Sequence, residues 1–266
     1  MKTGIGIFTA AFVALGASWA GLVLAPMLQL GDAQQTTVLN SSDVYPIQRP
    51  GAATLGLQVY RANGCAACHT RQVQQDGVAF EVVLTSPGTN AMAVTNLLST
   101  LKTAGLTKEA ADAAAQSLAA AGGKTETHLA ATGTDIARGW GFRRSVAADY
   151  LYDAPVELGN LRAGPDLANV GERNPDANQQ LVHLYAPTAV VKDSTMPSFK
   201  FLFTVRPVGA TPSPEALKLP AGFEAPKGFE VVPTPEAAEL AAYLLSLHAD
   251  APLYEAPYTP GTTAKP

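Results

Sequence analysis

Apolar residues dominate the first 31 positions of the chain. After Lys2, no charged residue occurs before Asp32. The intervening run of about 20 mostly apolar residues is long enough to cross a bilayer as a helix. A cleaved signal peptide is the alternative, because Ser18-Trp19-Ala20 resembles a small-residue cleavage site, but the apolar run continues beyond it. The pattern predicts a retained transmembrane anchor over residues 1–31, and Lys2 favours a cytoplasmic N-terminus.

Beyond the anchor, the spacing of apolar residues predicts mainly helices. Residues 32–50 are polar with scattered prolines and are expected to form a linker. Residues 51–62 place Leu55, Val59 and Ala62 on one helical face. Short helical pieces are expected around 145–151 and 178–185. A closing helix is expected from Thr234 or Pro235 to His248, since proline is favoured at the first position of a helix.

Two segments interrupt this helical pattern within a predicted domain over residues 51–250. Residues 78–133 are expected to form an insertion: an extended stretch over 78–90, then a surface hairpin of two helices over about 91–104 and 107–122. Residues 206–233 contain six prolines and are expected to form a long loop without regular structure. Residues 251–266 are expected to form a C-terminal tail.

Composition excludes several classes of function. The formal net charge of −4 gives no support for nucleic-acid binding, which usually leaves a basic stripe on the protein. Two cysteines are too few for a disulfide framework, an all-cysteine zinc site or an iron–sulfur cluster. Where these two cysteines lie is therefore the informative feature.

Cys65-Ala66-Ala67-Cys68-His69 is the attachment pattern of c-type haem. Each thiol adds to one vinyl group of the haem, and the adjacent His69 places an imidazole under the iron. The alternatives are a redox Cys-x-x-Cys pair, which would need a βαβ context, and half of a zinc site, which would need further ligands. The pattern predicts one covalently bound haem c held by Cys65 and Cys68, with His69 as an axial ligand of the iron.

The second axial ligand is predicted to be Met196. Cytochrome c iron commonly takes a methionine sulfur opposite the histidine. Met196 lies in a loop and is followed by Pro197, which would hold the sulfur rigidly. A packing role for this methionine, or ligation by His183 or His248, is the alternative.

Other residues are candidates for the walls of the haem pocket. The carbonyl of Pro165, in a Gly-Pro segment, is a candidate to accept the second N–H of the histidine ligand. Tyr60, Trp140 and Tyr152, with Arg138, Arg143 or Arg144, are candidates for closing the pocket and pairing with the propionates. Each is individually more typical of plain surface or core.

The segments around these motifs resemble the mono-haem subunit, subunit II, of cbb3-type cytochrome c oxidases. The resemblance covers the anchor, about 45–75, about 134–204 and the closing helix. It is carried by these runs: Asn63-Gly64-Cys65-Ala66-Ala67-Cys68-His69-Thr70, Asp135-Ile136-Ala137-Arg138-Gly139-Trp140-Gly141, Arg144-Ser145-Val146-Ala147-Ala148-Asp149-Tyr150-Leu151-Tyr152-Asp153, Arg162-Ala163-Gly164-Pro165-Asp166-Leu167-Ala168-Asn169-Val170-Gly171, His183-Leu184-Tyr185 and Ser194-Thr195-Met196-Pro197. The insertion and the proline-rich loop have no counterpart in the family.

The resemblance implies a mainly α, class I cytochrome c-like domain with His69 and Met196 as axial ligands. It also implies an anchor in the bacterial inner membrane, a periplasmic haem domain, and partners that include a catalytic haem–copper subunit and other cytochrome c subunits. Electrons would pass through the haem to the catalytic subunit of a proton-pumping oxidase, and this chain would hold no active site of its own. The alternative is a membrane-tethered cytochrome that shuttles electrons between other complexes.

Overall fold

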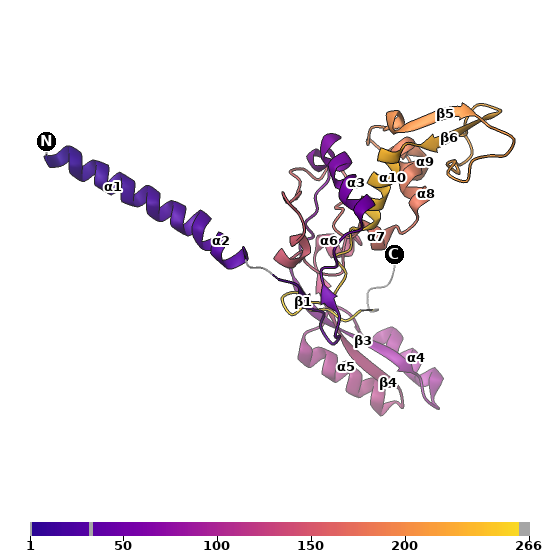
Figure 1. The fold of residues 1–266 in the computed structure, drawn as a ribbon. Coiled ribbons are helices and arrows are strands. Elements are labelled where there is room, and N and C mark those ends of the chain that lie inside the picture. The colour runs from indigo at the N-terminus through magenta and orange to yellow at the C-terminus, as the bar shows by residue number, and fades with distance from the viewer. Residues whose placement is uncertain (1, 32–33, 261–266) are drawn as a thin grey trace.

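The computed structural model describes residues 2–31 and 34–260. Met1, residues 32–33 of the predicted linker and residues 261–266 of the predicted tail lie outside the described residues. A long N-terminal helix reaches away from a helical domain, and a smaller unit projects from that domain in another direction (Figure 1). The elements are mixed: helices are accompanied by three two-stranded antiparallel sheets.

The N-terminal helix is continuous but changes its hydrogen-bond pattern along its length. It consists of α1 (Lys2–Trp19), a π-helical turn η1 (Ala20–Leu24) and α2 (Ala25–Leu30). The stretch Gly4–Gln29 is 26 residues long with a mean hydropathy of 2.0, and none of it is buried against the rest of the chain. This length and composition suit a membrane span. A signal sequence has the same properties, so retention of the anchor stays a prediction.

The helical domain is built on the packing of α3 (Gly51–Ala62) against α10 (Pro235–Leu245). The two backbones approach closely at Gly56, where an added Cβ would lie 2.8 Å from the Cβ of Tyr243. One turn further along α3, the rings of Tyr60 and Tyr243 pack with their centroids 5.2 Å apart. Glycine at the crossing therefore lets the aromatic pair form the centre of the core.

Local sequence signals explain the ends of α10. The hydroxyl of Thr234 accepts a hydrogen bond from the N–H of Ala237, and Pro235 occupies the first turn. Both are favoured at the start of a helix. The predicted start of the closing helix is thus confirmed, but the helix ends at Leu245 and does not reach His248. Short helices complete this domain: α6 (Thr134–Ala137), α7 (Val170–Arg173), α8 (Ala177–Tyr185) and α9 (Pro187–Val190), with the 3₁₀ turns η2 (Cys65–Ala67), η3 (Ala147–Tyr150) and η4 (Lys200–Leu202).

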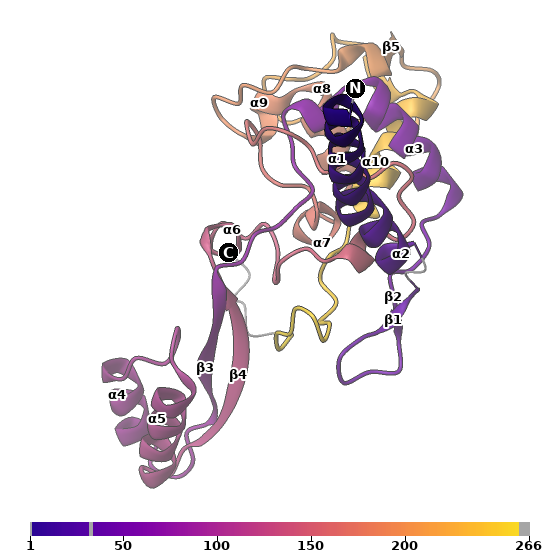
Figure 2. The same ribbon diagram turned by 90° about the vertical axis from the view of Figure 1, so that its left-hand side faces the viewer.

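The insertion is not a bare helical hairpin, and this prediction was wrong in part. Its two helices, α4 (Ala91–Thr100) and α5 (Lys108–Ala120), are present, but they pack on a sheet of β3 (Gly77–Ser86) and β4 (Lys124–Thr132). The register of the sheet runs from Gly77 opposite Thr132 to Ser86 opposite Lys124. Figure 2 shows this inserted unit, residues 77–132, projecting from the helical domain.

The inserted unit has its own small core. Val82 of β3, Val94 of α4 and Leu118 of α5 are almost completely buried against one another. No residue of this core belongs to the cluster between α3 and α10. The unit therefore has the organisation of a separately packed appendage.

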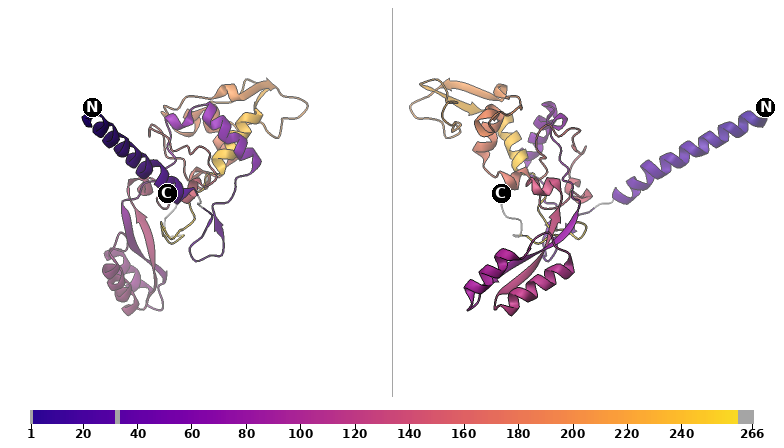
Figure 3. Two further views of the ribbon diagram at one scale, coloured as in Figure 1. Left: turned by 60° about the vertical axis from the view of Figure 1, so that its left-hand side comes forward. Right: turned by 180° about the vertical axis from the view of Figure 1, so that it is seen from behind.

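The proline-rich segment also contains regular structure. β5 (Phe203–Pro207) pairs with β6 (Phe229–Pro233), and both prolines sit at strand ends, where proline is tolerated. A further pair, β1 (Thr36–Thr37) and β2 (Val44–Tyr45), lies in the predicted linker. Seen from two sides, the β5–β6 hairpin and the inserted unit project from different ends of the domain (Figure 3). The described chain is therefore a mixed helix and sheet protein rather than a mainly α one.

The described part of the predicted tail folds back onto the protein. Leu253, Ala256 and Tyr258 are buried, and the ring of Tyr258 stacks on Phe142 with centroids 5.8 Å apart. The N–H of Thr259 donates to the carbonyl of Leu129 in β4 at 2.8 Å. This segment therefore links the helical domain to the base of the inserted unit.

Candidate haem site

The Cys-x-x-Cys-His segment forms a tight turn at the end of α3. Gly64 adopts a left-handed conformation, with φ of 64°, that ends the helix and starts the turn. The N–H of His69 then donates to the carbonyl of Cys65 at 3.0 Å. Within this turn, Cys65 is partly buried and Cys68 is exposed.

The environment of Cys65 does not resemble that of a reactive redox thiol. Burial raises the pKa of Cys65 to about 11. Redox-active thiols have lowered pKa values because the thiolate is the reactive form. The two cysteines are not joined by a disulfide. The local chemistry therefore gives no support for the Cys-x-x-Cys redox alternative.

His69 is oriented by the Gly164–Pro165 segment. The Nδ1 of His69 lies 2.9 Å from the carbonyl oxygen of Pro165. With the proton on Nδ1, this atom donates to the carbonyl, and Nε2 keeps its lone pair for a metal. The predicted contact between Pro165 and the histidine is thus present in the structure.

Gly164 fits against the face of the same imidazole. An added Cβ at this position would lie 2.7 Å from the Nδ1 of His69, closer than side chains tolerate. The N–H of Gly164 donates to the carbonyl of Cys68 at 3.0 Å. The glycine therefore fixes the segment directly beside the histidine ring.

A buried carboxylate holds the two segments together. Asp166 is fully buried and accepts hydrogen bonds from the hydroxyl of Thr70 at 2.5 Å and the N–H of Gln72 at 2.7 Å. A second oxygen accepts from the N–H of Ala168 at 2.8 Å. Three hydrogen bonds to one carboxylate make the position of Pro165 relative to His69 strongly determined.

The side chains of His69 and Met196 line one cavity, here called the central cavity. Its volume is about 220 Å³, below the range of about 300–1,000 Å³ that is usual for small-molecule and cofactor sites. The walls are mostly apolar, with a few polar groups near the opening. The lining residues are Tyr60, Cys65, His69, Pro165, Leu167, Val170, Arg173, Asn174, Gln180, His183, Leu184, Val190, Val191, Met196, Leu240 and Leu244.

These residues fit a c-type haem. An apolar slot, a cysteine sulfur, an imidazole and a thioether face the same space. The hydroxyl of Tyr60 is buried there without a hydrogen-bond partner in the described residues, and burial raises the pKa of Tyr60. The Tyr60 hydroxyl is thus a polar group at the cavity wall to which no described residue supplies a hydrogen bond.

Met196 and His183 both remain geometrically possible as the second axial ligand. Met196 is partly buried against the core and lines the cavity from the loop that follows α9. His183, on α8, lines it as well, and burial followed by the charge of His69 lowers its pKa. His248 does not line the cavity, so it is no longer a candidate for the second axial ligand. Met92 and Met27 are exposed on other elements.

Six of the predicted pocket residues do not line the cavity: Cys68, Trp140, Tyr152, Arg138, Arg143 and Arg144. Cys68 is exposed on the turn beside it. The ring of Trp140 lies between Arg138 and Arg162, whose guanidinium carbons are 4.9 and 5.5 Å from its centroid. Arg144 donates to the carbonyl of Glu255 at 2.7 Å and so holds the C-terminal segment.

The structure adds Arg173, which sequence reasoning did not identify. Arg173 lines the cavity and donates to the carbonyl of Asp166 at 2.8 Å. Burial lowers its pKa, and no ion pair with a carboxylate is recorded for it among the described residues. A cation at the wall of an apolar cavity suits the acidic edge of a cofactor. The available signal was its position two residues after the Gly164–Gly171 segment.

The comparison with known families supports the same assignment. Residues 134–223 match the family model described as cytochrome c oxidase, mono-haem subunit/FixO. No curated protein matches the chain significantly. The matched region contains Pro165, Arg173, His183 and Met196 of the central cavity, and the family is a mono-haem one, which supports haem as the cofactor. Residues 134–223 are thus similar to the mono-haem cytochrome c oxidase subunits, which confirms the predicted resemblance for this segment. The match extends to residue 223, so the first part of the proline-rich segment has a counterpart in the family, contrary to our expectation.

Proposed function

We propose that this chain is a membrane-anchored, mono-haem c-type cytochrome that passes electrons to the catalytic haem–copper subunit of a proton-pumping terminal oxidase. The observation that carries the proposal is the convergence of Cys65, His69, Pro165 and Met196 on one apolar cavity. These residues come from three separate segments of the chain. Convergence of this ligand set is what a class I cytochrome c requires.

The residues would hold the haem as follows. The S–H of Cys65 and that of Cys68 would each add across a vinyl double bond, forming a C–S bond while the hydrogen goes to the other vinyl carbon, so no oxidant is needed. His69 and Met196 would be the protein ligands of the iron. Pro165 keeps the imidazole in the tautomer that leaves Nε2 for the metal.

When bound, the haem iron supplies a one-electron redox couple. The protein contributes a fixed ligand set and an apolar wall, which limit reorganisation when the charge of the centre changes. Within this cavity Arg173 is a candidate partner for a propionate. The chain would need no catalytic residue of its own, because oxygen reduction takes place in the partner subunit.

The remaining parts of the proposal concern place and partners. The N-terminal helix would be retained in the bacterial inner membrane, with the N-terminus cytoplasmic and the haem domain periplasmic. The catalytic subunit and other cytochrome c subunits would contact the anchor and the haem domain. Support comes from the span-length helix and from the oxidase subunit family that the chain matches.

The test is the composition of the particle that the chain forms. The full chain is extracted in mild detergent through a C-terminal tag, and a reduced-minus-oxidised spectrum is recorded. The proposal predicts haem c together with haem b contributed by a partner. A particle that contains haem c in a single polypeptide would contradict the oxidase assignment and favour the membrane-tethered shuttle.

A further inference from the structure

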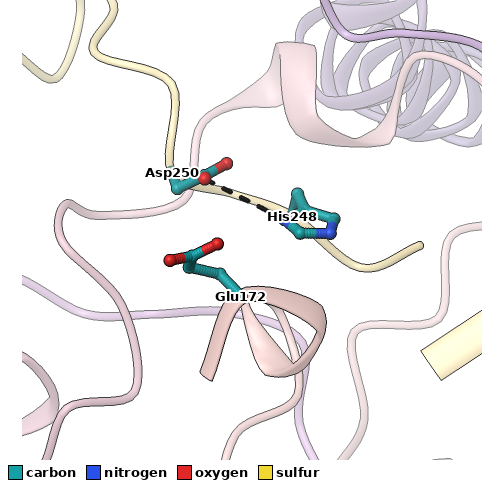
Figure 4. A group of neighbouring side chains, drawn as sticks. All are labelled: Glu172, His248 and Asp250. Carbon is teal, nitrogen blue, oxygen red and sulfur yellow. Dashed lines mark ion pairs between the residues drawn. The ribbon is translucent and has the colours of Figure 1, made fainter. Parts of the chain in front are cut away.

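Three metal-ligating side chains gather outside the central cavity. Glu172 lies on α7, and His248 and Asp250 lie in the segment that follows α10 (Figure 4). Each offers one ligand atom, and these atoms all lie within 4.8 Å of one another. None of the three residues lines the central cavity, so the group, here called the Glu172 cluster, is distinct from the haem site.

The backbone on both sides of the cluster is fixed. The N–H of Gly171 donates to the carbonyl of Leu247 at 3.0 Å, and the N–H of Ala249 donates to the side chain of Asn169 at 3.0 Å. The hydroxyl of Tyr45 donates to the carbonyl of His248 at 3.0 Å. The segments that carry the three side chains are thus hydrogen-bonded to each other immediately beside them.

The ring of His248 is oriented by close packing against α7. An added Cβ at Gly171 would lie 2.9 Å from the Nε2 of His248, so the imidazole rests directly on the glycine backbone. Its Nδ1 faces Asp250, with the carboxylate oxygen 3.9 Å away. Because Nε2 packs against the backbone, Nδ1 is the nitrogen of His248 that faces the cluster.

Glu172 is the carboxylate of the cluster without a partner, since Asp250 forms an ion pair with His248 at 3.9 Å when the imidazole is protonated. Glu172 makes no hydrogen bond or ion pair with any residue that the structure describes. The 3.9 Å separation of His248 and Asp250 is too long for a hydrogen bond. The nearby Arg143 is already bonded to Asp149 and to the carbonyl of Ala251. A bound cation would give Glu172 a partner of opposite charge.

We propose that Glu172, His248 and Asp250 bind a divalent transition-metal cation of the Zn²⁺ class, with water completing the coordination. One imidazole nitrogen and two carboxylate oxygens suit zinc, whereas calcium and magnesium prefer all-oxygen sites. In a tetrahedral zinc site, two ligand atoms that each lie about 2.1 Å from the ion are about 3.4 Å apart. Small side-chain rotations therefore bring the three atoms of the Glu172 cluster into range.

Such an ion would tie α7 to the start of the C-terminal segment. Glu172 follows directly after the Gly164–Gly171 segment, which orients His69, and Asp250 begins the stretch that reaches β4. The inference concerns stability of this junction and does not depend on the proposed function.

The experiment is a zinc titration of the haem-loaded full chain in detergent, followed by calorimetry. The protein carries no polyhistidine tag and is first stripped of metal with a chelator. Loaded haem is required because free Cys65 and Cys68 would bind zinc themselves. The variants are E172Q, H248Q and D250N, and the control is H128Q, which removes the exposed two-residue pair of His128 with Glu126.

The wild type and H128Q should bind one equivalent of zinc, and each of the three cluster variants should bind at least about tenfold more weakly. Excess calcium should not displace the zinc. Unchanged affinity in H248Q and E172Q, equal loss in H128Q, or displacement by equimolar calcium would overturn the proposal. The haem spectrum of each variant shows whether the chain is folded, and its absence from the wild type would count against the proposed function alone.

Discussion

At the scale of single residues, the haem site depends on contacts that hold His69 in one orientation. Pro165 accepts from its Nδ1, Gly164 packs against its ring, and Asp166 fixes the segment that supplies both. Only the order of residues around His69 was visible in the sequence. That Asp166 accepts three hydrogen bonds could not be foreseen, because the donors Thr70 and Gln72 lie far away along the chain.

Replacing Gly164 with alanine should disturb the histidine directly. The new Cβ would lie 2.7 Å from the Nδ1 of His69, so the ring or the segment must move and the contact with Pro165 must lengthen. Overpacking of this kind costs roughly 1–3 kcal/mol. Denaturant unfolding of the haem-loaded chain measures the loss. Gly209→Ala, whose added Cβ comes no nearer than 3.9 Å to another group, is the control; equal stability of both variants would refute the packing argument.

The identity of the second axial ligand can be read from the absorption spectrum. Met196→Ala should remove the weak red band of sulfur-to-iron charge transfer and lower the reduction potential by on the order of 0.1 V, because axial ligands set the potential over a wide range. Met92→Ala, on the exposed face of α4, should leave both unchanged. A wild type that lacks this band, and whose haem spectrum changes in His183→Gln but not in Met196→Ala, would assign the ligand to α8 instead.

At the scale of elements, helices with a local signal were predictable and strands were not. The segments that became α3, α5 and α10 carry apolar spacing of their own, and α5 and α10 each begin after a capping threonine. By contrast, β3 and β4 pair although two helices lie between them in the chain. Neither strand alternates clearly between apolar and polar residues. The prolines at the ends of β5 and β6 led to the prediction of a loop in place of this strand pair.

The inserted unit should be removable without loss of the haem site. Gly77 and Thr132 face each other at the base of the sheet, so a short Gly-Ser turn can replace residues 78–131. Because the core of the unit is separate from that of the helical domain, the shortened chain should bind haem with an unchanged spectrum. Spectroscopy of the purified variant measures this directly.

A second variant tests whether a loss of haem in the shortened chain is caused by the new Gly-Ser turn. Val94→Asp places a charge in the core of the inserted unit, where the valine is fully buried, and should unfold that unit alone. Burial of an unpaired charge is costly enough to do so. Loss of haem in both variants would show that the unit supports the haem domain.

At the scale of the whole molecule, three parts with separate tasks are joined in one chain. The N-terminal helix has the length of a membrane span, the helical domain holds the candidate haem ligands, and the inserted unit projects away from both (Figure 1). The haem motif and the anchor could be predicted from the sequence because each is a local pattern. The arrangement of the parts could not, because it rests on contacts such as Thr259 with Leu129 that join distant segments.

The central claim is that electrons pass through this chain to an oxygen-reducing partner. The most direct measurement is to reduce the tagged, detergent-extracted particle without oxygen, mix it rapidly with oxygenated buffer and follow the absorbance of haem c. The account predicts that haem c is oxidised within the turnover time and that cyanide blocks this oxidation. Haem c that stays reduced in the presence of oxygen, in a particle without a partner subunit, would contradict it.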